Sequence, residues 1–380
     1  MIRFILGFLG SIFSWLTLAA FMGALTLGAI FWMYSRDLPS HEQLANYQPP
    51  TISRIYSGEG ELMDEFAKER RLYTPPEQIP ELVKHAFVSA EDKNFYVHKG
   101  YDLRGMVAAA VEAARGGRLR GASTITQQVM KNFLLSSDRS AERKIKELIL
   151  ATRLEGTLDK EHILGLYLNE IFLGQNSYGV TAAAQTYYNK TLDQLAPEEA
   201  AYLAALAQRP GNLHPVRQHD DAIARRNYVL KEMRENGYIT NAAYETAVAQ
   251  PLRTVQTGDY ESHRSALPPR DYFTDEIRRQ LSRNFGEEEF FGGGLTIRAT
   301  VDPELQVVAA HSLQKALEDR DRSSGSWRGT GKTVDPASID DGTWEDALGK
   351  VRVARNVTLG GQWFVAVVDQ IGDNQMSLKI

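Results

Sequence analysis

The N-terminal run from Phe4 to Ser35 contains no charged residue. A helix needs about 20 apolar residues to cross the hydrocarbon core of a bilayer, and this run is longer than that. A cleaved signal peptide has an apolar region of only about 7–15 residues, so the length of the run disfavours one. Trp32 and Tyr34 lie where interfacial aromatic side chains are expected. The sequence therefore predicts one transmembrane anchor over residues 4–35.

The composition of the chain excludes some classes of function. At 380 residues the chain has room for two or more domains. A net charge of -5 argues against a general nucleic-acid binder. The chain has no cysteine, which excludes disulfides and thiolate metal sites. A single early anchor before a large soluble portion favours export of that portion across the membrane.

Turn residues and apolar periodicity divide the rest of the chain. Residues 36–55 are polar and Pro-rich and predict a juxtamembrane linker. The segments "ISRIYS" and "ELMDEF" flank Gly58-Glu59-Gly60, a pattern typical of a β-hairpin. From Pro80 to Val248 the apolar residues recur at helical spacing, so residues 56–250 are expected to form a mainly α domain.

The pattern changes after that domain. Residues 251–302 predict linker strands, including one in "GGGLTIRATVD". In residues 303–380 a helix is expected in "PELQVVAAHSLQKALED", followed by a loop and by short alternating strands. This last region is predicted to be a partial, β-rich, OB-like domain. Because it stops within a strand pattern, the chain is expected to be part of a longer protein.

The stretch "SAEDKNFYVHKGYD" places Glu91 and Asp92 directly after the apolar segment "ELVKHAFVSA". By itself this pair is more typical of a solvated helix end. The alternative is a carboxylate held in a cleft for acid–base chemistry.

The stretch "GASTITQQVMKN" carries the pattern of a capped helix. Thr124 and Gln127 have the spacing of a capping box, and Lys131 follows one turn after Gln127. A free helix N-terminus with hydroxyl groups and bases nearby suits a phosphate. A capped surface helix and a phosphate cradle both remain open. Further bases lie in the Gly-rich loop upstream: Arg115, Arg118 and Arg120.

In "RKIKE", Arg143 and Glu147 are four residues apart, which by itself predicts an ordinary surface ion pair. Taken with Glu91 and the bases upstream, the set suits sugar transfer from a lipid-linked pyrophosphate. That reaction needs a base for the acceptor hydroxyl and cations for the leaving group.

Together these segments resemble a known family. The motifs "EDKNFYVHKGYD", "GASTITQQVMKN", "RKIKE", "KEHILGLYLNEIFLG" and "QRPGNLHP", in this order and spacing, closely resemble the glycosyltransferase family 51 peptidoglycan polymerases. The segment "LTIRATVDPELQVVA" is similar to the junction after this domain in bifunctional class A penicillin-binding proteins of the 1A type. The chain is thus identified as the N-terminal part of such an enzyme.

The resemblance implies a lysozyme-like fold and polymerisation of lipid II into β-1,4 glycan strands, with inversion and release of undecaprenyl pyrophosphate. It implies that Glu91 is the general base and that Glu147 is the second catalytic carboxylate. Binding of the substrate is implied for Ser123, Thr124, Thr126, Gln127, Gln128, Lys131, Asn132, Arg143 and Lys144. Positioning of Glu91 is implied for Asp92, Phe95, His98 and Gly100.

Cofactors and partners follow from the same resemblance. The resemblance allows a divalent metal ion, Mg²⁺ or Mn²⁺, to bind together with the pyrophosphate near Glu147. No other metal site is assigned. The expected partners are lipid II, the growing glycan strand and the inner-membrane bilayer, with the catalytic domain in the periplasm. An outer-membrane lipoprotein activator and a homodimer are suggested as well, and nucleic acid is not expected.

Two alternative functions are also considered. One is a membrane-anchored lytic glycan hydrolase with Glu91 as its acid, and the other is a non-enzymatic cell-wall scaffold. A transpeptidase site is not expected within these residues. Ser312 and Lys315 fit a Ser-x-x-Lys pattern, but the Ser-x-Asn and Lys-Thr-Gly motifs of penicillin-reactive sites do not follow.

Overall fold

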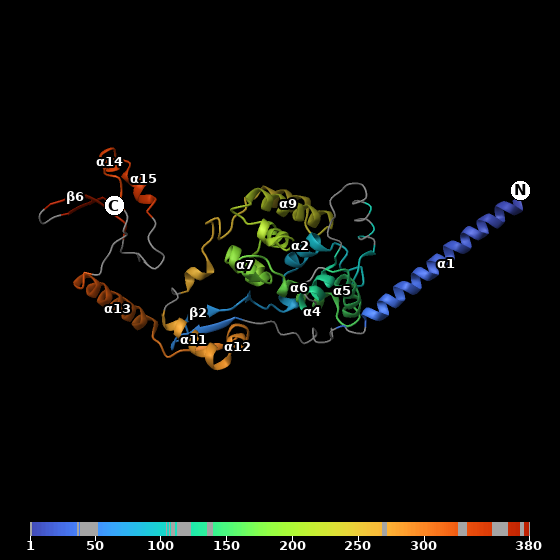
Figure 1. The fold of residues 1–380 in the computed structure, drawn as a ribbon, viewed down its shortest axis with the longest axis horizontal. Coiled ribbons are helices and arrows are strands. Elements are labelled where there is room, and N and C mark those ends of the chain that lie inside the picture. The colour runs from blue at the N-terminus through green and yellow to red at the C-terminus, as the bar shows by residue number, and fades with distance from the viewer. Residues whose placement is uncertain are drawn as a thin grey trace. The chain divides into compact units, whose positions relative to one another are not determined.

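The computed structural model describes residues 2–35, 38, 52–103, 105, 107, 111, 123–134, 140–267, 272–325, 333–351, 364–372 and 376–379. It divides into two compact units, Met1–Thr300 and Val301–Ile380, each of which is described by itself (Figure 1). Most of the predicted 36–55 linker and the bases Arg115, Arg118 and Arg120 lie outside the described residues.

The uncharged N-terminal run, apart from its last residue Ser35, lies within helix α1 (Ile2–Tyr34) (Figure 1). In the part of the chain that the structure describes, no helix meets the combined demands of length and apolarity for crossing a membrane.

The predicted hairpin is confirmed. β1 (Ser53–Tyr56) pairs antiparallel with β2 (Leu62–Phe66), and Gly60 takes a positive φ of 93° in the turn between them. The predicted strand near residue 297 is β5 (Thr296–Arg298), which pairs in parallel with β1. Helices α11 (Tyr272–Phe285) and α12 (Glu287–Gly292) precede β5. This small sheet therefore joins two segments that are far apart in the sequence.

The prediction of a mainly α domain is confirmed. Between the hairpin and residue 250, the helices of the described residues include α2 (Glu81–Glu91), α4 (Ile125–Leu134), α5 (Ala141–Leu154), α6 (Lys160–Glu170), α7 (Val180–Tyr188), α8 (Pro197–Leu206), α9 (His219–Glu235) and α10 (Asn241–Ala249). A short parallel pair, β3 (Arg70–Arg71) and β4 (Ser177–Tyr178), lies beside α7. Likeness to lysozyme stays a prediction.

Local sequence explains where these helices begin and end. The side chains of Ser140 and Asp159 cap α5 and α6 by accepting hydrogen bonds from the backbone N–H groups of Arg143 and His162. Pro197 occupies the first turn of α8, as predicted. Gly237, with a φ of 77°, follows the end of α9.

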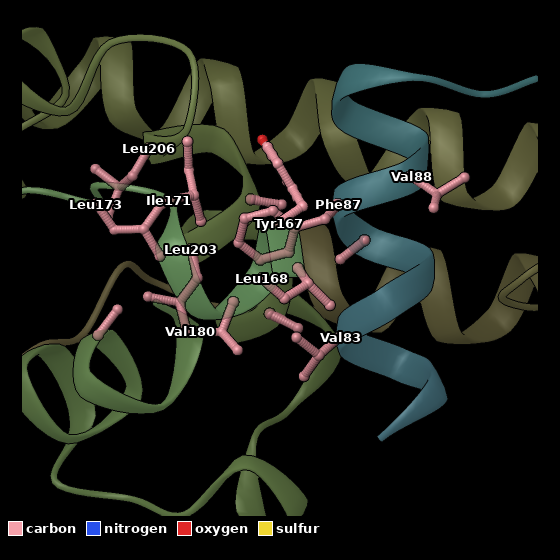
Figure 2. Packing of buried hydrophobic residues seen from close by; sticks show 14 of the residues in the cluster. Val83, Phe87, Val88, Tyr167, Leu168, Ile171, Leu173, Val180, Leu203 and Leu206 are labelled. Atoms are coloured by element: carbon pink, nitrogen blue, oxygen red, sulfur yellow. The ribbon is translucent and has the colours of Figure 1, made fainter. Parts of the chain in front are cut away.

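The core of the domain is packed between α2, α6, α7 and α8 (Figure 2). Phe87 of α2 and Tyr167 of α6 are both buried, with their ring centroids 6.2 Å apart in an edge-on arrangement. Val83 and Leu203 are also fully buried. Because α2 is held by this core, its C-terminal residue Glu91 has a fixed place.

The described residues of the second unit contain more helix than predicted, and the strands predicted over residues 352–363 lie outside the described residues. The expected helix is α13 (Pro303–Ser323), but α14 (Pro336–Asp340) and α15 (Trp344–Gly349) are also helical. The side chain of Asp335 caps α14, and this Asp-Pro start explains the first unexpected helix. Among the described residues of this unit, the strands are the antiparallel pair β6 (Val367–Ile371) and β7 (Met376–Lys379).

Candidate active site

Glu91 is the last residue of α2, and its carboxylate lies against α4. Its Oε2 accepts a hydrogen bond of 2.8 Å from Nε2 of Gln128. The side chain is half-buried, so it is neither a solvated surface group nor sealed within the core. The interpretation of the pair as a solvated helix end does not hold for Glu91.

The surroundings of Glu91 raise its pKa above the ordinary value. The main cause is burial, which removes hydration from the charged form, and the negative charge of Asp92 acts in the same direction. The hydrogen bond from Gln128 and the positive charges of Arg225 and Lys131 oppose the rise in pKa without cancelling it. A carboxylate with a raised pKa is a stronger base than an exposed one and is better suited to take a proton near neutral pH.

Asp92 is buried and joins three parts of the site. Its Oδ2 accepts a 3.0 Å hydrogen bond from the backbone N–H of Ile125 and lies 2.8 Å from Nε2 of His98. Ile125 is the first residue of α4, so Asp92 holds the start of α4 beside the end of α2. The ring of the buried Phe95 packs edge-on against His98. This geometry fits the positioning role that the resemblance implies for these residues.

Position 100 requires a glycine, both because of its backbone conformation and because neighbouring atoms leave no room for a side chain. Its φ is 90°, and an added Cβ would lie 2.8 Å from the backbone C and O atoms of Ala151. Its carbonyl accepts a 2.8 Å hydrogen bond from Oγ1 of Thr124. The close approach of this loop to α5 therefore depends on the missing side chain.

Replacing Asp92 with Ala is expected to destabilise the fold by about 2–3 kcal/mol, because buried donors at Ile125 and His98 lose their acceptor. Asp92→Asn is the matched control, since its amide oxygen can still accept from Ile125. Chemical denaturation of the three proteins measures the difference. Equal stability of Asp92→Ala and the wild type would contradict this role.

The predicted capping box of α4 is confirmed. The N–H of Gln127 donates to Oγ1 of Thr124 at 3.2 Å, and the N–H of Thr124 donates to Oε1 of Gln127 at 3.4 Å. From α5, Nζ of Lys144 donates to Oε1 of Gln127 at 3.2 Å and to Oγ of Ser123 at 2.7 Å. An ammonium group thus lies at the N-terminal end of α4, where the helix dipole also favours an anion.

Glu147 is 3% exposed and is held by two cations from its own helix. Its Oε1 lies 3.0 Å from Nε of Arg143, and its Oε2 lies 2.8 Å from Nζ of Lys144. An ordinary exposed pair is the wrong interpretation, because the carboxylate is buried.

The residues around Glu147 do not form a ready metal site. Both of its oxygens face cationic side chains, which a metal ion would have to displace. Within the described residues, no three His, Cys, Asp or Glu side chains are grouped to hold a metal ion. The divalent metal stays a prediction.

Lys131 and Asn132 lie on the exposed surface of α4. The Lys131 charge is close enough to Glu91 to oppose the rise of its pKa. Among the described residues, the ammonium group of Lys131 has no hydrogen-bond or ion-pair partner. It is therefore available to an anionic ligand.

The two carboxylates are tied to adjacent residues of one helix. Glu91 binds Gln128, and Glu147 is linked to Gln127 through Lys144. The structure therefore brings the residues predicted from three separate motifs to the first turns of α4.

Arg225 of α9 was missed by the sequence reasoning. Its guanidinium donates a 3.4 Å hydrogen bond to the carbonyl of Ala90, and its charge opposes the rise of the Glu91 pKa. It also lies over the ring of Tyr228, 4.6 Å from the centroid. In the sequence, Arg225 is only one of several charged residues on a helical segment, and this pattern does not connect α9 with the end of α2.

Glu155 was also missed. Its Oε1 accepts hydrogen bonds from Oγ1 of Thr126 at 2.6 Å and from Nζ of Lys160 at 2.7 Å. Lys160 in turn lies over the ring of Phe95, 4.4 Å from its centroid. Thr126 is fully buried, and its hydroxyl group is bound within the protein by Glu155; its predicted contact with the substrate stays a prediction.

Comparison with known proteins finds a family that matches the region containing these residues. The family described as transglycosylase matches residues 59–234, a range that contains the residues of the candidate active site. This region of the chain is therefore similar to the transglycosylase family, and the resemblance found in the motifs is confirmed.

Similar proteins carry the name penicillin-binding protein 1A. The chain is 40% identical to that of Rickettsia bellii over 96% of its own length and 45% of the relative. It is 40% identical to that of Aquifex aeolicus over 83% of its length and 42% of the relative. A crystal structure of the Haemophilus influenzae protein matches with 24% identity and a TM-score of 0.48, over 87% of this chain and 38% of that one. The chain thus spans less than half the length of these relatives.

Proposed function

We propose that this chain is a peptidoglycan glycosyltransferase that polymerises lipid II. The proposal rests above all on Glu91: its carboxylate is half-buried, has a raised pKa and lies near the positive charge of Lys131, which has no partner within the described part of the chain. The match of residues 59–234 to the transglycosylase family supports the same reaction class.

In the proposed reaction, Glu91 takes the proton of the 4-hydroxyl group of the acceptor sugar. The oxygen of that hydroxyl forms a bond to C1 of the donor sugar as the bond from C1 to the pyrophosphate breaks. The α-linked donor becomes a β-1,4 linkage by this direct displacement, and undecaprenyl pyrophosphate leaves. The hydrogen bond from Gln128 fixes the direction of the carboxylate during the transfer.

The leaving pyrophosphate carries negative charge that must be stabilised. Arg143 and Lys144 supply two cations against the single anion Glu147, and Lys131 adds a third cation. Glu147 holds the two α5 cations in place before the substrate binds. The N-terminus of α4 adds its dipole.

Lys131→Ala is expected to lower kcat/KM for lipid II about 10–100-fold, because one charge-assisted hydrogen bond to the pyrophosphate is lost. Lys231→Ala on α9 is the matched control, since Lys231 is also exposed but is paired with Glu235. Initial rates of lipid II consumption measure both variants. Equal losses in the two would remove Lys131 from the donor site.

A lytic glycan hydrolase is the second candidate. The raised pKa of Glu91 would also suit a general acid, which must carry a proton in the resting enzyme. The cations around Glu147 and Lys131 weigh against it, because cleavage of a neutral glycoside releases no pyrophosphate.

Separate incubations with lipid II and with purified glycan strands test the proposed function. We expect lipid II to be consumed, with glycan chains formed, and purified glycan to stay intact. Consumption of glycan but not of lipid II would favour the hydrolase. No reaction with either substrate would favour the non-enzymatic scaffold.

The location is part of the same proposal. The uncharged run over residues 4–35 would anchor the chain in the bacterial inner membrane with the catalytic domain in the periplasm. Such a place would give the enzyme access to a lipid-linked substrate. The lipoprotein activator and the homodimer remain predictions.

A further inference from the structure

A cavity of about 480 Å³ lies within the first unit, lined by none of the residues of the candidate active site. Its walls come from β2, β3, the 3-10 helix His263–Ala266, α11 and α12. Sites for small ligands commonly measure about 300–1,000 Å³, so the cavity is large enough for one.

The charged groups that line the cavity are mainly positive: three guanidinium groups lie there with the single carboxylate of Glu65. Arg70 lies 3.7 Å from Glu65 and donates to Gln185, and Arg278 donates to Asp275 at 2.8 Å. Among the described residues, the guanidinium of Arg264 has no hydrogen-bond or ion-pair partner. Glu65 is also paired with Arg54 at 3.0 Å, so at least one positive charge is uncompensated.

Two polar atoms at the wall are buried and have no hydrogen-bond partner in the described part of the chain. They are Nδ1 of His263 and Oε1 of Gln256. The Nε2 of Gln256 already donates to the carbonyl of Thr186 at 3.1 Å, which fixes the amide with its oxygen unpaired. Burial and the charges of Arg70 and Arg264 lower the pKa of His263 to about 4, so its ring is neutral at pH 7.

These features define what a ligand must offer. The uncompensated charge calls for a single negative charge, and Oε1 of Gln256 calls for an N–H or O–H donor. Phe66, Leu267 and Phe291 add apolar surface to the same wall. The C-terminal end of a peptide offers all three, because a carboxylate, an amide N–H and an apolar side chain lie within two residues.

We propose that this cavity binds the carboxylate end of a peptide. Arg264 receives the carboxylate, Gln256 accepts the amide N–H, and the aromatic wall holds the apolar side chain. The site is independent of the polymerisation chemistry, since it shares no residue with the candidate active site.

Titration of the intact chain with acetyl-Leu-Ala and with its C-terminal amide, by calorimetry or ligand-observed NMR, tests the proposal. The acid should bind at least about tenfold more tightly than the amide, because the amide forfeits a charge-assisted hydrogen bond. The Arg264→Gln substitution should weaken binding of the acid by a similar factor. The matched control is Arg279→Gln on α11, which removes a charge that is also exposed and that pairs with Glu276 outside the cavity.

Several results would overturn the proposal: no binding of the acid at about 10 mM, equal binding of acid and amide, or equal effects of Arg264→Gln and Arg279→Gln. Displacement of the peptide by an equal concentration of inorganic phosphate would also overturn it, in favour of a general anion site. Arg264 is exposed, so its replacement should leave the unfolding temperature unchanged and the comparison valid.

Discussion

The Glu91→Gln variant should lose about 10²–10⁴-fold of the wild-type rate of lipid II polymerisation, the usual contribution of a general base. Gln has nearly the same shape, and its amide oxygen can still accept the hydrogen bond from Gln128. The change therefore removes the base without removing the contact that positions it. Initial rates at equal concentrations of folded protein measure the effect.

The same variant should be at least as stable as the wild type at pH 7. Burial raises the Glu91 pKa above its ordinary value of 4.5, so the folded state keeps a proton that the unfolded state releases between the two values. Wild-type stability therefore falls as pH rises through this window and does not recover above it. Gln cannot ionise and escapes this loss. Denaturation at pH 4 and pH 8 checks the sign, and a variant less stable than the wild type at pH 8 would contradict it.

Gly100→Ala should destabilise the fold by about 3 kcal/mol or more, since it combines an unfavourable positive φ with a steric overlap. The new Cβ would lie 2.8 Å from backbone atoms of Ala151, which cannot rotate away. Movement of this loop would also displace the carbonyl that Thr124 binds. Loss of polymerisation should accompany the loss of stability.

The Gly60→Ala variant separates the two causes of destabilisation, the positive φ and the steric overlap. Gly60 has a φ of 93°, close to that of Gly100, but an added Cβ would meet no atom within 4 Å. The backbone strain alone should then cost about 1 kcal/mol. Thermal or urea unfolding of both variants compares the costs. Similar values would mean that the overlap with Ala151 contributes nothing.

Local signals in the sequence were sufficient for much of the fold. Apolar periodicity predicted the helices from α2 to α10, and the Gly58–Gly60 turn predicted the hairpin. The Thr124 and Gln127 capping box was predicted from spacing alone, because its bonds form within one helical turn. The helices α14 and α15 were missed because they are short and carry no long apolar repeat.

The candidate site depended on contacts that spacing does not encode. Glu91 and Glu147 were selected by motif resemblance, but the pKa of Glu91 depends on its burial and on side chains from other helices, such as Gln128 of α4 and Arg225 of α9. Arg225 and Glu155 act across such contacts and carry no local pattern. Thr126 was expected to bind the substrate, but its hydroxyl donates to Glu155.

The central claim is that Glu91, in its charged form, is the base for polymerisation of lipid II. The pH dependence of kcat/KM, measured side by side for wild type and Glu91→Gln, tests it most directly. The wild-type rate should rise with pH through a midpoint above 4.5, the ordinary value for this carboxyl group. The small residual rate of Glu91→Gln should lack that rise, although the phosphates of lipid II titrate equally in both reactions. An identical rise in the two proteins would contradict the account.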